Sequence, residues 1–126
     1  MAKTKILVIE DDKSLVKLIE AALDQKKFKV ILALEADEGV EKARIEKPAI
    51  IILDILLPGK SGFECLSNLK QQKETREIPV IILSNLGQSE EIRKGLELGA
   101  IDYLVKADLS IDELVKKISQ AAIKKS

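Results

Sequence analysis

Polar side chains follow the short apolar runs of this sequence, at the points where those runs end. These residues are Glu10, Asp11, Asp12, Asp54, Ser84 and Lys106. Carboxylates that gather in one place repel one another unless they are protonated or bridged by a cation, and a single ammonium group does not balance three of them. Oxygen ligands suit a hard divalent cation, most simply Mg²⁺, with Mn²⁺ as a second choice. The residue types therefore predict a metal site if the fold brings these positions together.

A carboxylate in such a site can act as a covalent nucleophile toward a phosphoryl group. Catalysis of phosphoryl transfer depends mainly on positioning and on neutralising charge. Asp54 has the features of the acceptor. The cation would cover some phosphoryl oxygens, Lys106 would cover another, and the Ser84 hydroxyl would donate to a third. Each residue also has a plainer explanation, such as a helix cap at Asp12, and only the combination favours this chemistry.

The elements that must position these residues are strands and helices in alternation. The runs at 49–53 and 79–83 are continuous and β-branched, which is typical of parallel strands buried on both faces. The five predicted strands are Ile6–Ile9, Phe28–Leu34, Ala49–Leu53, Pro79–Leu83 and Ile101–Val105. Apolar residues at helical spacing lie between and after them, in two main stripes. The stripes are Leu15, Leu18, Ile19, Ala22 and Leu23, and Leu114, Val115, Ile118, Ala121 and Ala122.

This alternation predicts the α/β class, as a three-layer α/β/α (βα)5 protein with helices on both faces of the sheet. We expect five parallel strands in the flavodoxin-like order 2-1-3-4-5, with ligands bound beyond the carboxyl ends of the strands. The second strand would then lie at an edge, and only it ends without a reactive residue. Candidate helix starts are Ser61 and Ser110, each with a glutamate three residues later, and Asp37.

Composition narrows the class of protein further. The 126 residues predict a single domain over 1–126, structured from about 4 to 124, and no output domain. The 21 basic and 21 acidic residues cancel, which argues against direct binding of nucleic acid or anionic lipid. The absence of histidine excludes Ser-His-Asp and Cys-His catalysis and imidazole zinc sites. We expect a cytoplasmic location for three reasons. Cys65 has no second cysteine to pair with, the N-terminus has no signal sequence, and no apolar run is long enough to insert in a membrane.

Four motifs resemble, in order and spacing, the receiver domain of bacterial two-component response regulators, a CheY-like domain here expected to stand alone. IEDD (9–12) is similar to the acidic cluster of that family, and ILDILLPGKSG (52–62) to the segment with the phosphoacceptor aspartate. IILSN (81–85) is similar to the switch hydroxyl segment, and GAIDYLVKAD (99–108) to the segment with the switch aromatic and the lysine. The resemblance covers about residues 4–124.

The resemblance implies that Asp54 accepts a phosphoryl group from a sensor histidine kinase or a histidine phosphotransfer protein. Asp11 and Asp54 would bind Mg²⁺ together with the backbone carbonyl of Leu56, and Glu10 would act through water. The domain would be a signalling phosphoacceptor in a phosphorelay, not an enzyme, and would catalyse only its own phosphorylation and autodephosphorylation.

The resemblance also implies a switch. Lys106 would contact the phosphoryl group, Ser84 would move toward it, and Tyr103 would change rotamer to fill the vacated space. A downstream protein would read the change on the face of the fourth helix, fifth strand and fifth helix. The chain would be a monomer or a weak, phosphorylation-dependent homodimer.

Two positions depart from the family pattern. Ala107 follows Lys106 where proline is common and often cis, and because a non-proline cis bond costs about 2.5–4 kcal/mol, the isomer at this bond stays open. Asn85 is larger and more polar than the small residue usual after the switch hydroxyl. Together with Leu56, it is expected to influence the access of water and the lifetime of the phosphoryl group.

Three alternative functions compete with this prediction. A phosphohydrolase with an aspartate nucleophile needs a second aspartate two residues later, where this chain has Leu56. A flavin or nucleotide module needs a Gly-rich or Ser-rich loop after the first strand, where this chain has EDDKS. The third, a phosphate-independent receiver-like interaction module, is disfavoured by the full set of polar residues but left open by Asn85 and Ala107.

Overall fold

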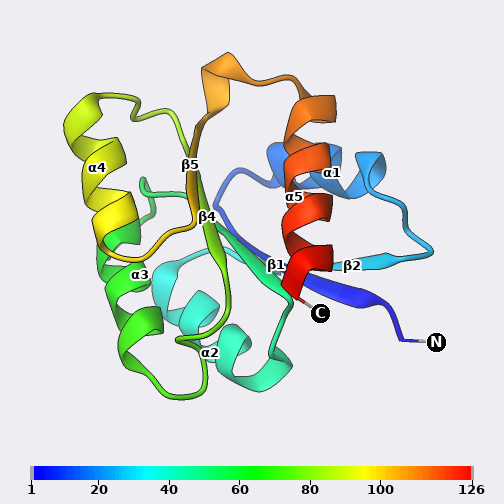
Figure 1. The fold of residues 1–126 in the computed structure, drawn as a ribbon, viewed down its shortest axis with the longest axis horizontal. Coiled ribbons are helices and arrows are strands. Elements are labelled where there is room, and N and C mark those ends of the chain that lie inside the picture. The colour runs from blue at the N-terminus through cyan, green and yellow to red at the C-terminus, as the bar shows by residue number, and fades with distance from the viewer. Residues whose placement is uncertain (1, 126) are drawn as a thin grey trace.

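The computed structural model describes residues 2–125, in which strands and helices alternate along the chain (Figure 1). The elements in chain order are β1 (Thr4–Ile9), α1 (Lys13–Ala22), β2 (Phe28–Ala33), α2 (Ala36–Glu46), β3 (Ile50–Leu53), α3 (Gly62–Gln71), β4 (Val80–Ser84), α4 (Ser89–Glu97), β5 (Asp102–Val105), the 3-10 turn η1 (Lys106–Asp108) and α5 (Ile111–Lys125). All strand pairs are parallel and their order is β2-β1-β3-β4-β5, so the predicted fold class is confirmed.

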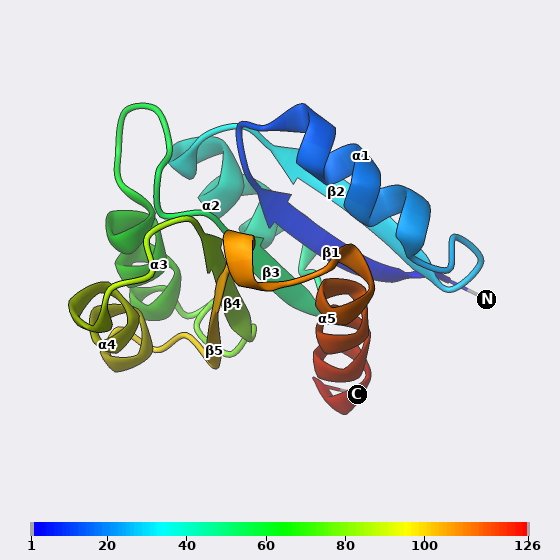
Figure 2. The same ribbon diagram turned by 90° about the horizontal axis from the view of Figure 1, so that it is seen from above.

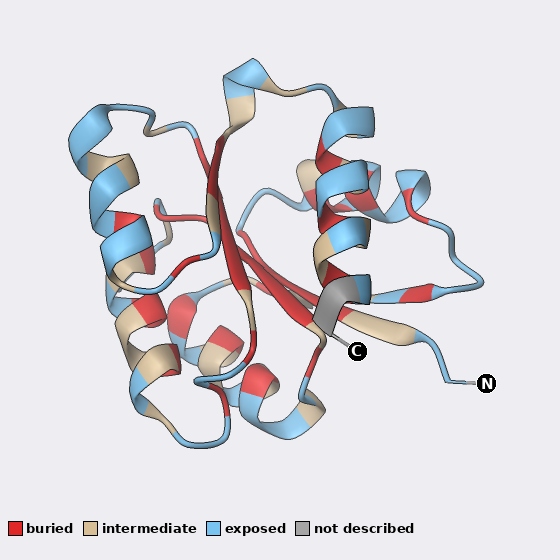
Figure 3. Cartoon of the chain, viewed as in Figure 1, coloured by how far each residue is buried: buried red, intermediate tan, exposed pale blue. Residues whose placement is uncertain are grey.

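The helices form two layers on the sheet. Figures 1 and 2 show α1 and α5 on one face and α2, α3 and α4 on the other. Alternate residues of a strand point to opposite faces, and each face of β3 is apolar: Ile51 and Leu53 pack toward α3, whereas Ile50 and Ile52 pack toward α5. This is why the central runs are continuous rather than alternating. In Figure 3 the central strands are accordingly the most buried part of the chain.

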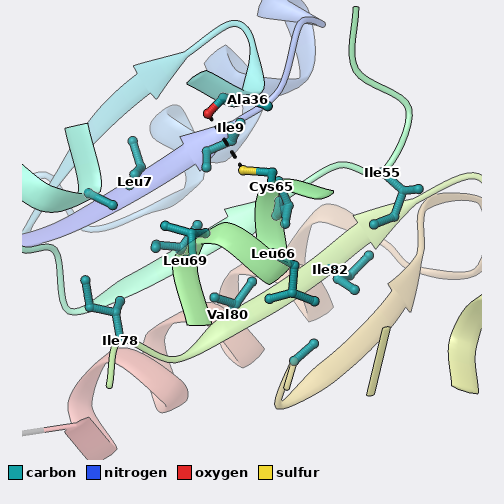
Figure 4. Packing of buried hydrophobic residues seen from close by; sticks show 14 of the residues in the cluster. Leu7, Ile9, Ala36, Ile55, Cys65, Leu66, Leu69, Ile78, Val80 and Ile82 are labelled. Carbon is teal, nitrogen blue, oxygen red and sulfur yellow. Dashed lines mark hydrogen bonds between the residues drawn. The ribbon is translucent and has the colours of Figure 1, made fainter. Parts of the chain in front are cut away.

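The core under α3 holds the one cysteine. Cys65 is fully buried with Leu66 and Leu69 of the same helix, and its thiol is 3.8 Å from the carbonyl oxygen of Ala36 (Figure 4). Cys65 thus packs as a small apolar residue of this core.

Most predicted helix starts are confirmed. The Asp12 carboxylate accepts hydrogen bonds from the backbone N–H groups of Ser14 and Leu15 at the start of α1. Ser110 and Glu113 exchange side-chain bonds with each other's N–H groups at the start of α5, and the Ser61 hydroxyl accepts from the Glu64 N–H at α3. These side chains satisfy donors that the first helical turn leaves unpaired.

Two local predictions were wrong. Asp37 does not cap α2, because the helix begins one residue earlier, at Ala36, and Asp37 instead pairs with Lys60 at 2.9 Å. Leu18 is not in the core: α1 buries Val16 and Ile19, and Leu18 is 58% exposed. No helix in residues 2–125 is long and apolar enough to span a membrane.

Candidate functional site

Three carboxylates meet at the carboxyl ends of β1 and β3. Glu10, Asp11 and Asp54 each place one oxygen within 4.8 Å of the others. The strands are neighbours in register, with Ile9 beside Leu53, and the Asp54 N–H donates to the Ile9 carbonyl at 3.0 Å. The end of one strand therefore lies beside the end of the other, which is why residues 44 positions apart share a site.

Lys106 reaches these carboxylates from the end of β5. Its Nζ lies 2.7 Å from Glu10 Oε1 and 2.9 Å from Asp54 Oδ2. No cis peptide bond occurs in the described chain, so the Lys106–Ala107 bond is trans, and Lys106 opens the short turn η1. A trans bond at this position is thus compatible with a lysine that contacts Asp54.

The electrostatics of the site are set by burial. Glu10 is 3% exposed and Asp54 is 4% exposed. Burial raises the pKa of Glu10 to about 7, although the Lys106 ammonium and the Asp12 N–H, 3.1 Å away, hydrogen-bond to it and act in the opposite direction. Burial by itself would lower the pKa of Lys106, but its bonds to Glu10 and Asp54 outweigh burial and raise it. Lys106 is therefore held in its charged form.

The donor set fits a hard divalent cation. Its ligand atoms are all carboxylate oxygens, and their span of at most 4.8 Å is near the roughly 4 Å between opposite ligands of Mg²⁺. One ammonium against three carboxylates leaves negative charge in a largely buried place, which a cation would neutralise. Leu56 lies in the loop after β3, where its N–H donates to Asp54 Oδ1 at 3.1 Å. Its side chain is 54% exposed at the rim.

The predicted switch residues lie together beside this cluster. Ser84 is fully buried, and its hydroxyl oxygen accepts from the Leu86 N–H at 3.3 Å. The Tyr103 hydroxyl donates to the Leu86 carbonyl at 2.5 Å, so the ring points inward under the loop between β4 and α4. Burial raises the pKa of Tyr103, and the nearby Ser84 hydroxyl acts against this. Asn85, between them, is exposed at the rim.

Two residues of the site were missed by sequence reasoning. Leu86 joins Ser84 to Tyr103 through its backbone, and a backbone role leaves no trace in the residue type. Gly62 begins α3 against the acceptor loop, and a Cβ there would lie 2.2 Å from the Asp54 carbonyl oxygen and 2.5 Å from the Ile55 Cα. Only glycine fits this approach. The glycine directly after the Ser61 cap was the available signal.

Residues 6–119 match the family model of the response regulator receiver domain, and the chain belongs to this family. Receiver domains are signalling domains of two-component systems rather than classical enzymes, they bind divalent metal, and response regulators interact with histidine kinases.

The individual proteins that this chain resembles are also response regulators or their receiver domains. The phosphate regulon transcriptional regulatory protein PhoB of Escherichia coli is 38% identical over 114 residues, which are 90% of this chain and 49% of PhoB. The chain thus spans about half the length of this relative. The Francisella response regulator 1452 receiver domain has a TM-score of 0.87 and 29% identity, covering 98% of this chain and 100% of that one. The phosphorylated cyanobacterial phytochrome response regulator RcpA has a TM-score of 0.82 and 25% identity, covering 99% and 97%.

Proposed function

We propose that this chain is a phosphoacceptor receiver that takes a phosphoryl group onto Asp54 in a Mg²⁺-dependent reaction. The donor would be the phosphohistidine of a sensor kinase or of a histidine phosphotransfer protein. The observation that carries the proposal is the contact of Lys106 with the buried Asp54, in a cluster of three carboxylates of which Glu10 is also buried and Asp11 is exposed. The unbalanced negative charge of this cluster costs free energy unless a cation binds there. The carboxylate that Lys106 contacts, Asp54, is the proposed nucleophile.

In the proposed step, a carboxylate oxygen of Asp54 attacks phosphorus and the P–N bond of the phosphohistidine breaks. The electron pair of that bond stays on the imidazole, which takes up one proton from solvent at a ring nitrogen before or during the transfer and so leaves as the neutral ring. The Lys106 ammonium lies 2.9 Å from Asp54 Oδ2, so it is placed to offset the negative charge of the phosphoryl group once that group is bonded to Asp54. Mg²⁺ held by Asp11, Asp54 and the Leu56 carbonyl, with Glu10 through water, would neutralise phosphoryl oxygens. Ser84 supplies a hydroxyl donor from β4.

The output proposed for this reaction is a change on the α4-β5-α5 face. Once Ser84 turns toward the phosphoryl group, its bond to the Leu86 N–H is lost, and the loop that also holds Tyr103 is released from it. A bistable loop biased by a local charge change is a general form of molecular switch. We further propose that residues 1–126 act as one cytoplasmic domain and that a downstream protein reads this face. Asn85 and Leu56, at the rim, would set the lifetime of the phosphoryl group.

The test is intact mass after incubation with acetyl phosphate, with Mg²⁺ or with excess EDTA. We expect one added phosphoryl group that requires Mg²⁺ and is absent from Asp54→Asn. The matched control is Asp112→Asn, which removes the same charge from an exposed position on α5 and should leave the adduct unchanged. No adduct under any condition, with no binding of beryllofluoride, would favour the phosphate-independent interaction module instead.

A further inference from the structure

Helix α4 meets the sheet through a glycine. Gly95 is the only buried residue of Ser89–Glu97, so the helix approaches the sheet at this point with its backbone rather than with a side chain. In Figure 1, α4 stands beside β5. Glycine is less favourable than alanine inside a helix, so we expect the surroundings of Gly95 to require a residue without a side chain.

The reason is the space beside it. A Cβ on Gly95 would lie 2.5 Å from Ile82 Cδ1 and 3.0 Å from Cδ2 of the Tyr103 ring. The first distance is shorter than carbon atoms tolerate, and the second is tighter than ordinary contact. The ring of Tyr103 therefore occupies volume that any side chain at position 95 would need.

The two neighbours differ in their freedom to move away. Ile82 is fully buried in β4, between β3 and β5, with core residues around it. Tyr103 also belongs to the core, but it lies on β5 at the edge of the sheet, where its hydroxyl donates to the Leu86 carbonyl. The close-packed core around Ile82 restrains its terminal Cδ1, so an added methyl group would press on the ring as well, or lift α4 off it.

We propose that Gly95 is a positioning residue for Tyr103: its missing side chain admits the ring beneath α4, so the size of residue 95 decides whether the ring lies inward. The inference deepens the proposed function, because it rests on the switch role given there to Tyr103. With alanine at position 95 the bond to Leu86 is lost and the α4–β5 surface takes its outward form without any change at Asp54.

The environment of Tyr103 can be measured directly, since the chain has one tyrosine and no tryptophan. Quenching of tyrosine emission by acrylamide is compared between the native chain and Gly95→Ala, in EDTA and without phosphodonor. We expect the quenching constant to rise by about twofold or more, because a displaced ring exposes its face to water.

The matched control is Gly39→Ala in α2. A Cβ there would lie 2.5 Å from Ile9 Cδ1 and 2.8 Å from Ile9 Cγ1, a clash with an isoleucine at least as severe as that at Gly95, with no Tyr103 atom among its nearest neighbours. The control should lose stability without a change in quenching. An equal rise in both variants would mean general loosening and would overturn the proposal, as would no rise in folded Gly95→Ala.

If Gly95→Ala does not fold by circular dichroism, the same comparison is made in an Ile82→Val background. That substitution removes Cδ1 and leaves the Tyr103 ring as the nearest neighbour of position 95. Quenching must still rise relative to Ile82→Val alone, and unchanged quenching would overturn the proposal. Intact mass after acetyl phosphate, run in parallel, tests the proposed function separately, because the quenching comparison needs no phosphorylation.

Discussion

At the scale of residues, Lys106 offsets part of the negative charge of the acidic cluster. Its Nζ contacts two carboxylates at once, and its side chain is only 19% exposed. An ion pair with this little solvent is screened less than one on the surface, such as Lys60–Asp37. The arrangement holds Glu10 and Asp54 close together while the site stays short of positive charge, and that combination favours a cation.

Cys65 gives a prediction about pH. Burial raises the pKa of its thiol to about 12 from an ordinary value near 9. Since the folded-state pKa is the higher one, the thiol stabilises the folded state below pH 9, and this contribution is lost progressively as the pH rises from about 9 toward 12. We expect no reaction with Ellman's reagent at pH 8 until the protein unfolds. In Cys65→Ala the loss of stability above pH 9, measured by urea unfolding, should be smaller. Rapid labelling of the native protein would contradict this prediction.

At the scale of elements, the start of α1 depends on one side chain. Asp12→Ala removes the acceptor for two N–H groups and should lower the free energy of unfolding by about 1 kcal/mol. Asp12→Asn keeps an amide oxygen at the cap and removes only the charge, so it should stay within about 0.5 kcal/mol of the native chain. Urea unfolding in EDTA separates the two effects. A loss in Asp12→Asn as large as in Asp12→Ala would assign the effect to charge.

The elements also show what a sequence can predict. The alternation of strands and helices and the cap at Asp12 followed from residue types, because burial and capping act on side chains. The meeting of Glu10 with Asp54 followed from the flavodoxin-like strand order expected for such an alternation. Leu18 was misplaced because a stripe at helical spacing fits two nearby faces of α1, and only the packing against the sheet chooses between them. The carbonyl of Leu86 could not be found, because every residue has one.

At the scale of the whole molecule, the site occupies one end of the sheet and the proposed output face one side of it. The connection runs through the loop between β4 and α4, where Ser84, Leu86 and Tyr103 are joined by two hydrogen bonds. Helix α4 buries only Gly95 and packs the partly buried Ile92 against the core, whereas α3 buries Gly62, Cys65, Leu66 and Leu69. An element held this lightly moves at lower cost than its neighbours, so a small change at Ser84 is expected to reach the surface through α4.

The excess negative charge of Glu10, Asp11 and Asp54 over Lys106 predicts how a cation changes the stability of the whole domain. Mg²⁺ at about 100 times its dissociation constant should raise the free energy of unfolding by about 2.7 kcal/mol, because it binds the folded cluster and not the dispersed residues. Asp54→Asn removes two carboxylate repulsions and one ion pair, so without metal it should be more stable than the native chain by about 1 to 3 kcal/mol. It should also gain less from Mg²⁺. Urea unfolding by circular dichroism, with Asp112→Asn as the control, measures both effects. If Asp54→Asn is instead less stable without metal, the pair with Lys106 outweighs the repulsion, and the cluster holds together without a cation.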